Sequence, residues 1–207
     1  ERTAPHTRPK SFMIGDIRIT PFFNSHSIYD SYMFLIEADG KRIWHTGDYR
    51  DHGYLGKGLY PTLHRYASNI DLLITEGTTL KRGDLCIQES EVSRRMACVM
   101  SAFKYVIVLA SATDIERLAS VKTAALKARK GLYYTGGMMG RAMRIFTHRE
   151  AKSSKGLFAF HFKYVGEDDP KLGEMQKKGF VLVTGASHLD FVKKMCQGLS
   201  SSEVFSS

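Results

Sequence analysis

The pattern of apolar residues changes near residue 85, and this change limits the chain to two differently built parts. Before it, short runs with alternating apolar side chains are typical of strands that bury one face. After it, continuous apolar runs alternate with segments of helical spacing, which indicates a β-α-β-α series around a parallel sheet. We therefore predict an α/β protein with one domain over residues 1–84 and a second, α/β domain over residues 85–207.

The clearest local signal in the first part is a hairpin. Two β-rich runs, residues 32–37 and 41–45, flank Asp39 and Gly40, and Asp-Gly between such runs is a strong turn signal. The rest of this part is expected to hold strands over residues 16–23 and 69–76 and a short helix over residues 62–66.

The second part is expected to be a layered α/β structure. The predicted strands cover residues 105–110, 132–135 and 180–184, and the predicted helices cover residues 89–103, 113–130, 140–148 and 188–199. Residues 150–179 are expected to be rich in loops, with a strand over 157–162 and a helix over 170–178, and residues 200–207 carry no strong signal. Cys98 lies in an apolar-periodic stretch, which predicts a core position.

The charge balance narrows the choice of partner. Lys and Arg number 30 against 21 Asp and Glu, a net charge of +9, which favours an anionic partner such as nucleic acid or phosphate. The alternative is a basic surface that serves solubility alone. No apolar run reaches the length of a membrane helix, so no membrane partner is expected.

The three cysteines make no Cys-x-x-Cys pair. This spacing argues against a cysteine zinc site. Free thiols fit a reducing compartment, and no secretory signal is visible, so a cytoplasmic location is expected.

Two residues are candidate metal ligands. His26 and Asp48 each follow a predicted strand directly, and loops at strand ends can converge at one rim of a sheet. Imidazole and carboxylate together suit Zn²⁺ or Mn²⁺. From residue types alone, the alternatives are a surface histidine and an aspartate with a turn-forming role.

The order of these segments resembles the metallo-β-lactamase fold, and more narrowly the β-CASP nucleases of the ribonuclease J-like group. The match comprises a His26-Ser-Ile-x-Asp-Ser segment, the Asp-Gly hairpin and a Thr-Gly-Asp48 segment, with Tyr29 where the family often has Pro. The resemblance implies that His26 and Asp48 are metal ligands and that Asp48 bridges two zinc ions, with manganese as the alternative. It also implies a partial metallo-β-lactamase αββα sandwich followed by a β-CASP domain.

The resemblance extends to three further segments. Glu76 matches the family's acidic motif after a strand, although Gly77 replaces Ser, and this match implies a catalytic role for Glu76 in ordering the site around Asp48. Ser111 and Arg117 fall in a segment that faces the nucleic-acid channel in the family.

Elementary chemistry supports a phosphate-binding role for Ser111, Thr113 and Arg117, because hydroxyls at a helix N-terminus and a guanidinium both suit phosphate. The alternative is that Thr113 caps a helix, with Glu116 completing a capping box, and that Arg117 is simply solvated.

Two glycine-containing turns follow predicted strands. The segment from Gly136 to Gly140 fits neither Gly-x-Gly-x-x-Gly nor a P-loop and is interpreted as a flexible turn before a helix. The segment from Gly185 to His188 is similar to a turn that the family has at this place, and His188 is expected not to be a ligand.

The family's first metal motif, His-x-His-x-Asp-His, does not occur, and neither do its closing motifs. We therefore expect the chain to be the middle of a longer enzyme, or to be completed by a partner chain or homo-oligomer. The implied activity is a metal-dependent ribonuclease in which zinc-bound hydroxide attacks a phosphodiester, with RNA favoured over DNA. The alternatives are a non-catalytic β-CASP module that binds RNA or a partner subunit, and a small-molecule metallo-hydrolase.

Overall fold

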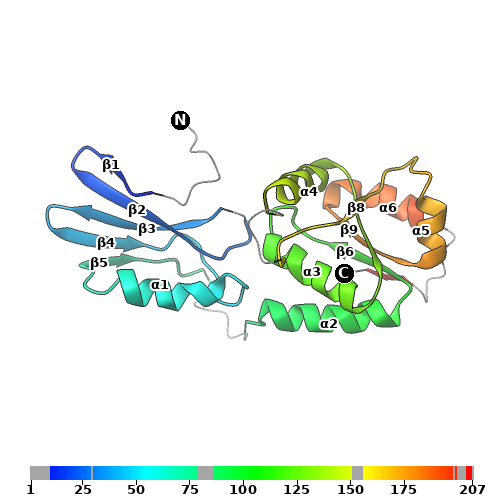
Figure 1. Cartoon of the computed structure of the whole chain (residues 1–207), viewed down its shortest axis with the longest axis horizontal. Helices are drawn as coiled ribbons and strands as arrows, with labels where there is room; N and C mark the ends of the chain where they lie inside the picture. Colours follow the sequence, from blue (N-terminus) through cyan, green and yellow to red (C-terminus); the bar gives the residue numbers. More distant parts are fainter. Residues whose placement is uncertain are drawn as a thin grey trace. The chain divides into compact units, whose positions relative to one another are not determined.

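Two five-stranded sheets form the framework of the chain (Figure 1). The computed structural model describes residues 10–28, 30–78, 86–150, 156–197, 199 and 204–206. The chain divides into unit 1, Glu1–Cys86, and unit 2, Ile87–Ser207, and each unit contains one of the sheets. The fold is therefore of the α/β class.

Unit 1 is a mixed sheet with one helix. The strand order is β1-β2-β3-β4-β5; all neighbours are antiparallel except β4 and β5, which are parallel. The elements are β1 (Phe12–Ile14), β2 (Ile17–Phe23), β3 (Tyr32–Ala38), β4 (Lys41–His45), the 3₁₀ turn η1 (Gly56–Gly58), α1 (Leu59–Tyr66) and β5 (Leu72–Ile74).

The predicted hairpin is confirmed. Strands β3 and β4 pair from Ala38↔Lys41 onward. Asp39 and Gly40 both have positive φ, 49° and 70°, which is the conformation that a two-residue hairpin turn requires and that Asp-Gly tolerates. The helix predicted over residues 62–66 is confirmed as α1, which begins earlier, at Leu59, directly after η1.

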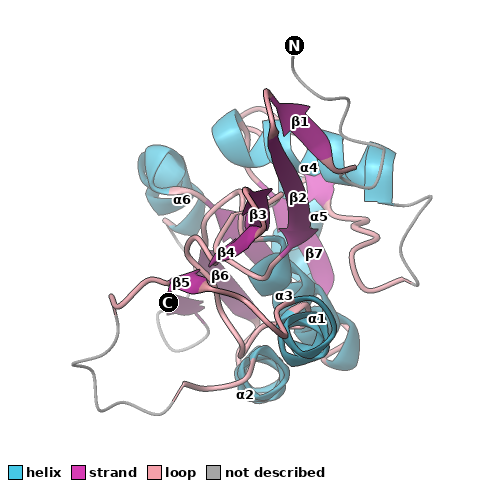
Figure 2. Ribbon diagram, turned by 90° about the vertical axis from the view of Figure 1, so that its left-hand side faces the viewer, coloured by secondary structure: helices cyan, strands magenta, loops and turns pink. Residues whose placement is uncertain are grey.

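Helix α1 packs on one side of the unit 1 sheet (Figure 2). Met33, Leu35 and Trp44 alternate with outward-facing neighbours along β3 and β4, and they form a buried cluster with Leu59 of α1. Phe22 stacks on Trp44 with ring centroids 5.1 Å apart. This cluster joins β2, β3 and β4, and β2 and β4 lead into the loops of the candidate ligands His26 and Asp48.

Unit 2 is built on an all-parallel sheet in the order β10-β6-β9-β7-β8. Its apolar runs are continuous because both faces are covered. The elements are α2 (Glu89–Ala102), β6 (Tyr105–Leu109), α3 (Ile115–Lys127), β7 (Gly131–Tyr134), α4 (Gly137–Glu150), β8 (Lys163–Tyr164), α5 (Leu172–Lys178), β9 (Phe180–Thr184), η2 (Ala186–His188), α6 (Leu189–Cys196) and β10 (Val204–Ser206).

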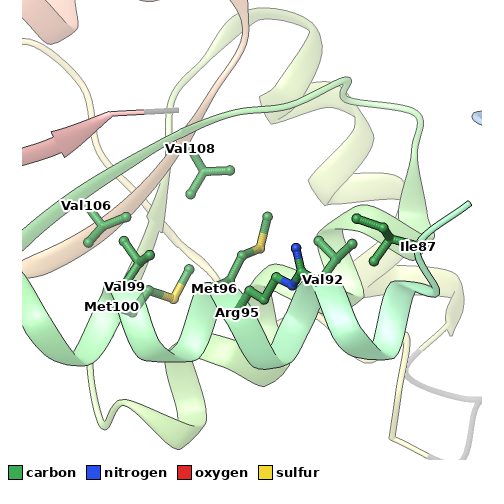
Figure 3. Close-up of a pocket in the computed structure, with 8 residues that line it drawn as sticks. All are labelled: Ile87, Val92, Arg95, Met96, Val99, Met100, Val106 and Val108. Carbon is green, nitrogen blue, oxygen red and sulfur yellow. The ribbon is translucent and has the colours of Figure 1, made fainter. Parts of the chain in front are cut away.

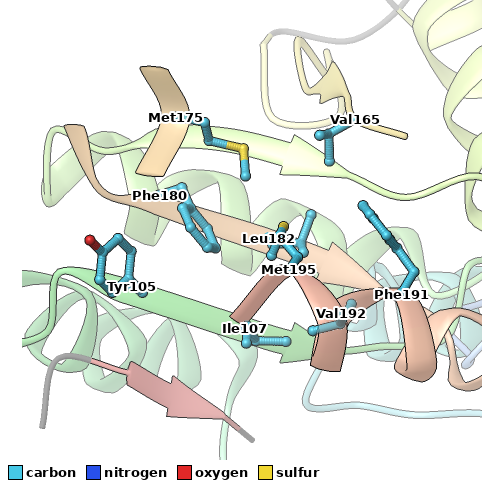
Figure 4. Close-up of a cluster of buried hydrophobic side chains, with 9 residues drawn as sticks. All are labelled: Tyr105, Ile107, Val165, Met175, Phe180, Leu182, Phe191, Val192 and Met195. Carbon is cyan, nitrogen blue, oxygen red and sulfur yellow. The ribbon is translucent and has the colours of Figure 1, made fainter. Parts of the chain in front are cut away.

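One face of the parallel sheet packs against α5 and α6. Tyr105 and Ile107 of β6 and Phe180 and Leu182 of β9 are buried there, together with side chains of the two helices (Figure 4). The alternate residues Val106 and Val108 lie on the opposite face, toward α2.

Two expectations for unit 2 are wrong, and one strand was not expected. Cys98 is exposed, because it lies on the solvent side of α2. The strand expected over residues 157–162 is instead the short β8, Lys163–Tyr164. The last described residues form β10, which pairs with β6 from Val204↔Tyr105 and had no signal in the sequence.

Candidate functional site

Three candidate residues of unit 1 follow strands that end at the same rim of the sheet. Strands β2 and β4 are both antiparallel to β3, so they run in the same direction, and β5 is parallel to β4. His26 follows β2, Asp48 follows β4 and Glu76 follows β5. The topology therefore brings the three loops to one edge.

The structure brings His26 and Asp48 together at this rim. Nε2 of His26 lies 3.8 Å from Oδ2 of Asp48. The side chain of His26 is 25% exposed and that of Asp48 is 70% exposed, so the carboxylate is open to a ligand. Nδ1 of His26 shares a hydrogen bond with Oγ of Ser27, at 3.2 Å, which holds the ring with Nε2 toward Asp48.

Glu76 is held beside this pair. Its Oε1 accepts a hydrogen bond from the main-chain N–H of Tyr49, at 2.8 Å, and its Oε2 accepts one from the Thr78 hydroxyl. The Thr78 hydroxyl, the Tyr49 N–H and the nearby charge of His26 together lower the pKa of Glu76 against the opposing effect of burial. Glu76 is therefore ionised, and it anchors the backbone next to Asp48.

Asn24 ties the loop of His26 to the loop of Asp48. Its buried side chain donates from Nδ2 to the main-chain carbonyls of Thr46, at 3.1 Å, and of Asp48, at 3.0 Å. The main-chain N–H of Arg50 donates to the carbonyl of Ser25, at 2.7 Å. Sequence reasoning missed Asn24; its only signal was a polar side chain directly at the end of β2.

The turn into Asp48 requires glycine. Gly47 has φ +56°, and a Cβ at this position would lie 3.2 Å from the carbonyl oxygen of Tyr32. The N–H of Gly47 donates to Nδ1 of His45, at 3.2 Å, and the N–H of Thr46 donates to the carbonyl of Ile74, at 2.9 Å. These bonds fix the backbone from the end of β4 to Asp48.

The rim fits a metal ion in part. Two donor atoms 3.8 Å apart can both lie near the ~2.0–2.2 Å at which zinc binds nitrogen and oxygen after small side-chain rotations. A catalytic zinc takes three protein ligands, and among the described residues there is no group of three or more His, Cys, Asp or Glu side chains placed to hold a metal. His26 and Asp48 could supply two ligands, and further donors would have to come from elsewhere.

Of the phosphate-binding candidates of unit 2, Ser111 and Thr113 lie between β6 and α3, and Arg117 lies in the first turn of α3. The hydroxyls of Ser111 and Thr113 are 3.1 Å apart on the loop that leads into the helix. Asp114, not Thr113, caps α3: its Oδ1 accepts from the N–H of Arg117, at 3.1 Å. The alternative reading with a Thr113 cap is therefore wrong.

Arg117 is engaged in an ion pair. Its Nη2 donates to Oε1 of Glu89, at 2.8 Å, and its Nε also contacts that carboxylate. Glu89 is 2% exposed, and its Oε2 accepts from Oγ of Ser120, at 2.6 Å. The hydrogen bond to Glu89 raises the pKa of Arg117. Arg117 is therefore not the solvated side chain of the alternative interpretation. Its Nε and Nη2 already donate to Glu89, which leaves only its remaining N–H groups for another ligand.

The two glycine-containing turns meet at the carboxyl edge of β7 and β9, which are neighbours in the sheet. The hydroxyls of Thr135 and Thr184 are buried and 3.0 Å apart. Gly137 has φ +65°, and a Cβ there would lie 2.5 Å from Cε1 of His188. His188 thus packs directly on Gly137, the first residue of α4. The segment from Gly136 to Gly140 is therefore mostly the start of this helix, and its interpretation as a flexible turn before a helix is wrong. The sequence showed two separate turns and no sign of this contact.

A cavity of about 240 Å³ lies between α2 and β6 (Figure 3). Arg95 is the only charged residue on a lining that is otherwise apolar: Ile87, Val92, Met96, Val99, Met100, Val106 and Val108. The lining offers no group that could act as a nucleophile.

Comparison with known proteins supports the fold alone. No family model matches the sequence, and no curated protein matches it. A similar solved structure belongs to a protein of unknown function from Enterococcus faecalis V583, with a TM-score of 0.67 and 14% identity over 97% of this chain. The match covers 53% of that protein, so this chain spans about half of its length. Across the described residues, the helices lack the length and apolarity to cross a membrane.

Proposed function

We propose that the rim of unit 1 is part of a metal-dependent hydrolase site and that His26 and Asp48 are metal ligands. The observation that carries this proposal is the approach of Nε2 of His26 to within 3.8 Å of Oδ2 of Asp48 on loops from two different strands. The hydrogen bonds donated by Nδ2 of Asn24 and by the main-chain N–H of Gly47 position these loops without any bound ion. A rim built in advance is what a metal site requires.

The residues of the rim have distinct roles in this proposal. Zinc ions, or manganese, would supply a hydroxide at neutral pH and polarise a phosphate oxygen. The family resemblance implies that Asp48 would bridge two ions, and its carboxylate is largely exposed and so open to them. Glu76 stays ionised and holds the Tyr49 N–H, so it keeps the Asp48 loop in place and adds negative charge that favours cations.

We propose RNA as the substrate, which makes the protein a ribonuclease that cleaves phosphodiester bonds. The basic surplus supports a polyanion and lies almost wholly in unit 2. That unit has 19 Lys and Arg against 11 Asp and Glu, whereas unit 1 has 11 against 10. Phosphate contacts dominate the affinity of nucleic-acid binding, and Ser111, Thr113 and the remaining donors of Arg117 are the proposed phosphate contacts. The preference for RNA over DNA rests on the family resemblance.

The proposal places this chain in the metallo-β-lactamase/β-CASP group. Unit 1 would correspond to part of the metallo-β-lactamase sandwich and unit 2 to the β-CASP domain. The general α/β architecture and the all-parallel sheet of unit 2 are compatible with this assignment. The remaining ligands would come from a longer parent chain or from a partner chain.

A second candidate function is a non-catalytic module that binds RNA or a partner subunit. The observation in its favour is that, among the described side chains, only two donors meet at the rim and no group of three can hold a metal. A metal-independent RNA-binding activity without cleavage would establish this second function.

Cleavage of a labelled single-stranded RNA with added Zn²⁺ or Mn²⁺, by the complete enzyme that contains this chain and the remaining ligands, separates the two candidates. We expect His26→Ala and Asp48→Ala to abolish cleavage. The matched controls are His52→Ala and Asp51→Ala, because Nδ1 of His52 lies 3.6 Å from Oδ1 of Asp51 in a second pair that is not a proposed ligand pair. Equal activity of Asp48→Ala and wild type would contradict the metal assignment. RNA binding without cleavage by the wild type, unaffected by a chelator, would favour the second function.

A further inference from the structure

The cavity between α2 and β6 is larger than the gaps that ordinary packing leaves in a protein. Its volume is about 240 Å³, and Val106 and Val108 of β6 lie across it from the apolar side chains of α2 (Figure 3). Folded interiors contain few voids larger than a water molecule. An apolar cavity of roughly 150 Å³ stays dry and binds benzene. The cavity of unit 2 therefore has room for a ring or a short hydrocarbon chain.

Polar contacts with α3 hold α2 in the position that leaves this cavity open. Glu89, in the first turn of α2, accepts from Arg117 at 2.8 Å and from Oγ of Ser120 at 2.6 Å. One turn later, Oγ of Ser93 donates to the carbonyl of Ser120, at 3.1 Å. Glu89 and Ser93 are both 2% exposed. These bonds tie the first half of α2 to α3, so they oppose a movement of the helix toward the sheet that would close the cavity.

Arg95 brings an unmatched positive charge to the lining. Its side chain is 62% exposed, so it lies where the cavity opens to solvent. Its Nε donates to Oε1 of Glu91, at 2.8 Å, but the same carboxylate also binds Nε and Nη2 of Arg94. Among the described residues, no acceptor contacts the Nη groups of Arg95. Two arginines thus share one carboxylate, which leaves one positive charge in excess beside an apolar cavity.

We propose that this cavity binds a small apolar molecule with a single carboxylate group, such as a medium-chain fatty acid or an aromatic acid. The apolar part fills the space between α2 and β6, and Met96 and Met100 adapt to its shape because methionine is flexible. The carboxylate accepts hydrogen bonds from the Nη groups of Arg95, which a guanidinium donates well to such a group. One excess charge matches a monoanion better than a phosphate dianion. The proposal depends on neither the metal site nor RNA.

The test is the binding of octanoate to the full chain, measured by isothermal titration calorimetry, with 1-octanol as the uncharged probe of equal length. We expect saturable binding of octanoate to the wild type with a negative heat-capacity change, the mark of buried apolar surface. Octanol should bind about fivefold more weakly, and Arg95→Gln should weaken octanoate binding about fivefold, because an exposed ion pair contributes up to about 1 kcal/mol. Arg95→Gln should leave octanol binding unchanged.

Two further measurements place the ligand. The methyl resonances of Met96 and Met100 should shift on addition of octanoate, whereas that of Met33, a core residue of unit 1, should not. Val99→Phe should fill the cavity and abolish the binding of both probes.

Each variant has a matched control. Cys98→Phe places the same ring on the next residue, which is exposed and outside the lining, and should change nothing. Arg141→Gln removes an exposed charge from α4, also outside the lining, and controls for the loss of net charge. Far-UV circular dichroism checks that the variants are folded, and the exposed Arg95→Gln tests the proposal even if Val99→Phe does not fold.

The proposal is overturned if octanoate shows no saturable binding, if wild type and Arg95→Gln bind it equally, or if Met96 and Met100 do not respond. Binding to this chain that is lost in a longer protein containing it would assign the cavity to a segment of that protein. A mass above 23.3 kDa in light scattering, returned to that value by Val99→Phe, would assign the cavity to a second copy of the chain. Either result would also overturn the proposal.

Discussion

Nε2 of His26 and Oδ2 of Asp48 lie 3.8 Å apart, although the two residues follow different strands of the unit 1 sheet. The side chains meet because β2 and β4 run in the same direction on either side of β3. Their loops are fixed by main-chain hydrogen bonds to Asn24 and to His45. The supporting bonds can therefore be tested separately from the ligands.

Asn24→Ala should destabilise the rim. The substitution leaves the buried carbonyl of Thr46 and the part-buried carbonyl of Asp48 without their amide donor, and an unsatisfied buried polar group costs about 1–3 kcal/mol. Urea unfolding measures this loss. Ser11→Ala, at an exposed site of the same unit, is the control and should cost less than about 0.5 kcal/mol. Equal stability of Asn24→Ala and wild type would show that Asn24 does not hold the loops.

Gly47→Ala should also destabilise the protein, whereas Gly173→Ala should not. Gly47 has φ +56° and its Cβ would press on the carbonyl of Tyr32, so we expect a loss of about 1–2 kcal/mol. Gly173 lies in α5, and a Cβ there would meet no atom within 4 Å. Alanine at this helical position should stabilise by about 0.5–1 kcal/mol. Thermal melts of both variants check the opposite signs.

Arg117→Ala should destabilise unit 2 strongly. The substitution leaves the carboxylate of Glu89, which is 2% exposed, without its cationic partner. Removing one partner of a buried ion pair costs about 3 kcal/mol or more. Arg94→Ala is the control, because the pair of Arg94 with Glu91 is exposed and such pairs contribute about 1 kcal/mol or less.

Removing both charges of the Arg117–Glu89 pair distinguishes a structural role of Arg117 from a role in RNA binding. Arg117→Met combined with Glu89→Gln should recover much of the lost stability, because no buried charge is left unpaired. Weaker RNA binding by this stable double variant would support the phosphate contact of Arg117. Unchanged RNA binding would leave Arg117 with a structural role only.

Glu76 should make stability depend on acid pH. Its folded pKa is below the ordinary value of 4.5, through the Thr78 hydroxyl and the Tyr49 N–H. A lowered folded pKa adds stability that is complete above the unfolded value and is lost as pH falls through the folded value. Wild type should therefore lose its advantage over Glu76→Gln as pH drops below 4.5. Urea midpoints from pH 7 to pH 3 measure the difference, and a constant gap would contradict this role of Glu76.

Local signals in the sequence predicted the parts of the fold that depend on neighbouring residues. The Asp39-Gly40 turn and the buried strand β6 are examples, because turn chemistry and continuous apolar runs are both read over a few positions. Strand β10 could not be predicted in this way. It is three residues long, and its ladder is formed with β6, about a hundred positions earlier in the chain.

For the candidate site too, local features could be predicted from the sequence and contacts between distant segments could not. The loops of His26 and Asp48 could be placed at strand ends from the strand pattern, and the structure brings the two side chains together. The hydrogen bonds of Asn24 and the pairing of Glu89 with Arg117 join distant segments. Such contacts leave no periodic pattern in a single sequence, so they became visible only in the folded chain.

Zinc uptake by the complete protein, in which the parent chain or the partner chain supplies the remaining ligands, tests the central claim most directly when the wild type is compared with Asp48→Asn. Equilibrium dialysis followed by mass spectrometry counts the bound ions as the free zinc concentration is raised. We predict saturable binding to the wild type, at least tenfold weaker binding to Asp48→Asn, and unchanged binding to the control Asp51→Asn. Absence of saturable uptake by the wild type, or equal uptake by wild type and Asp48→Asn, would contradict the assignment of Asp48 as a metal ligand.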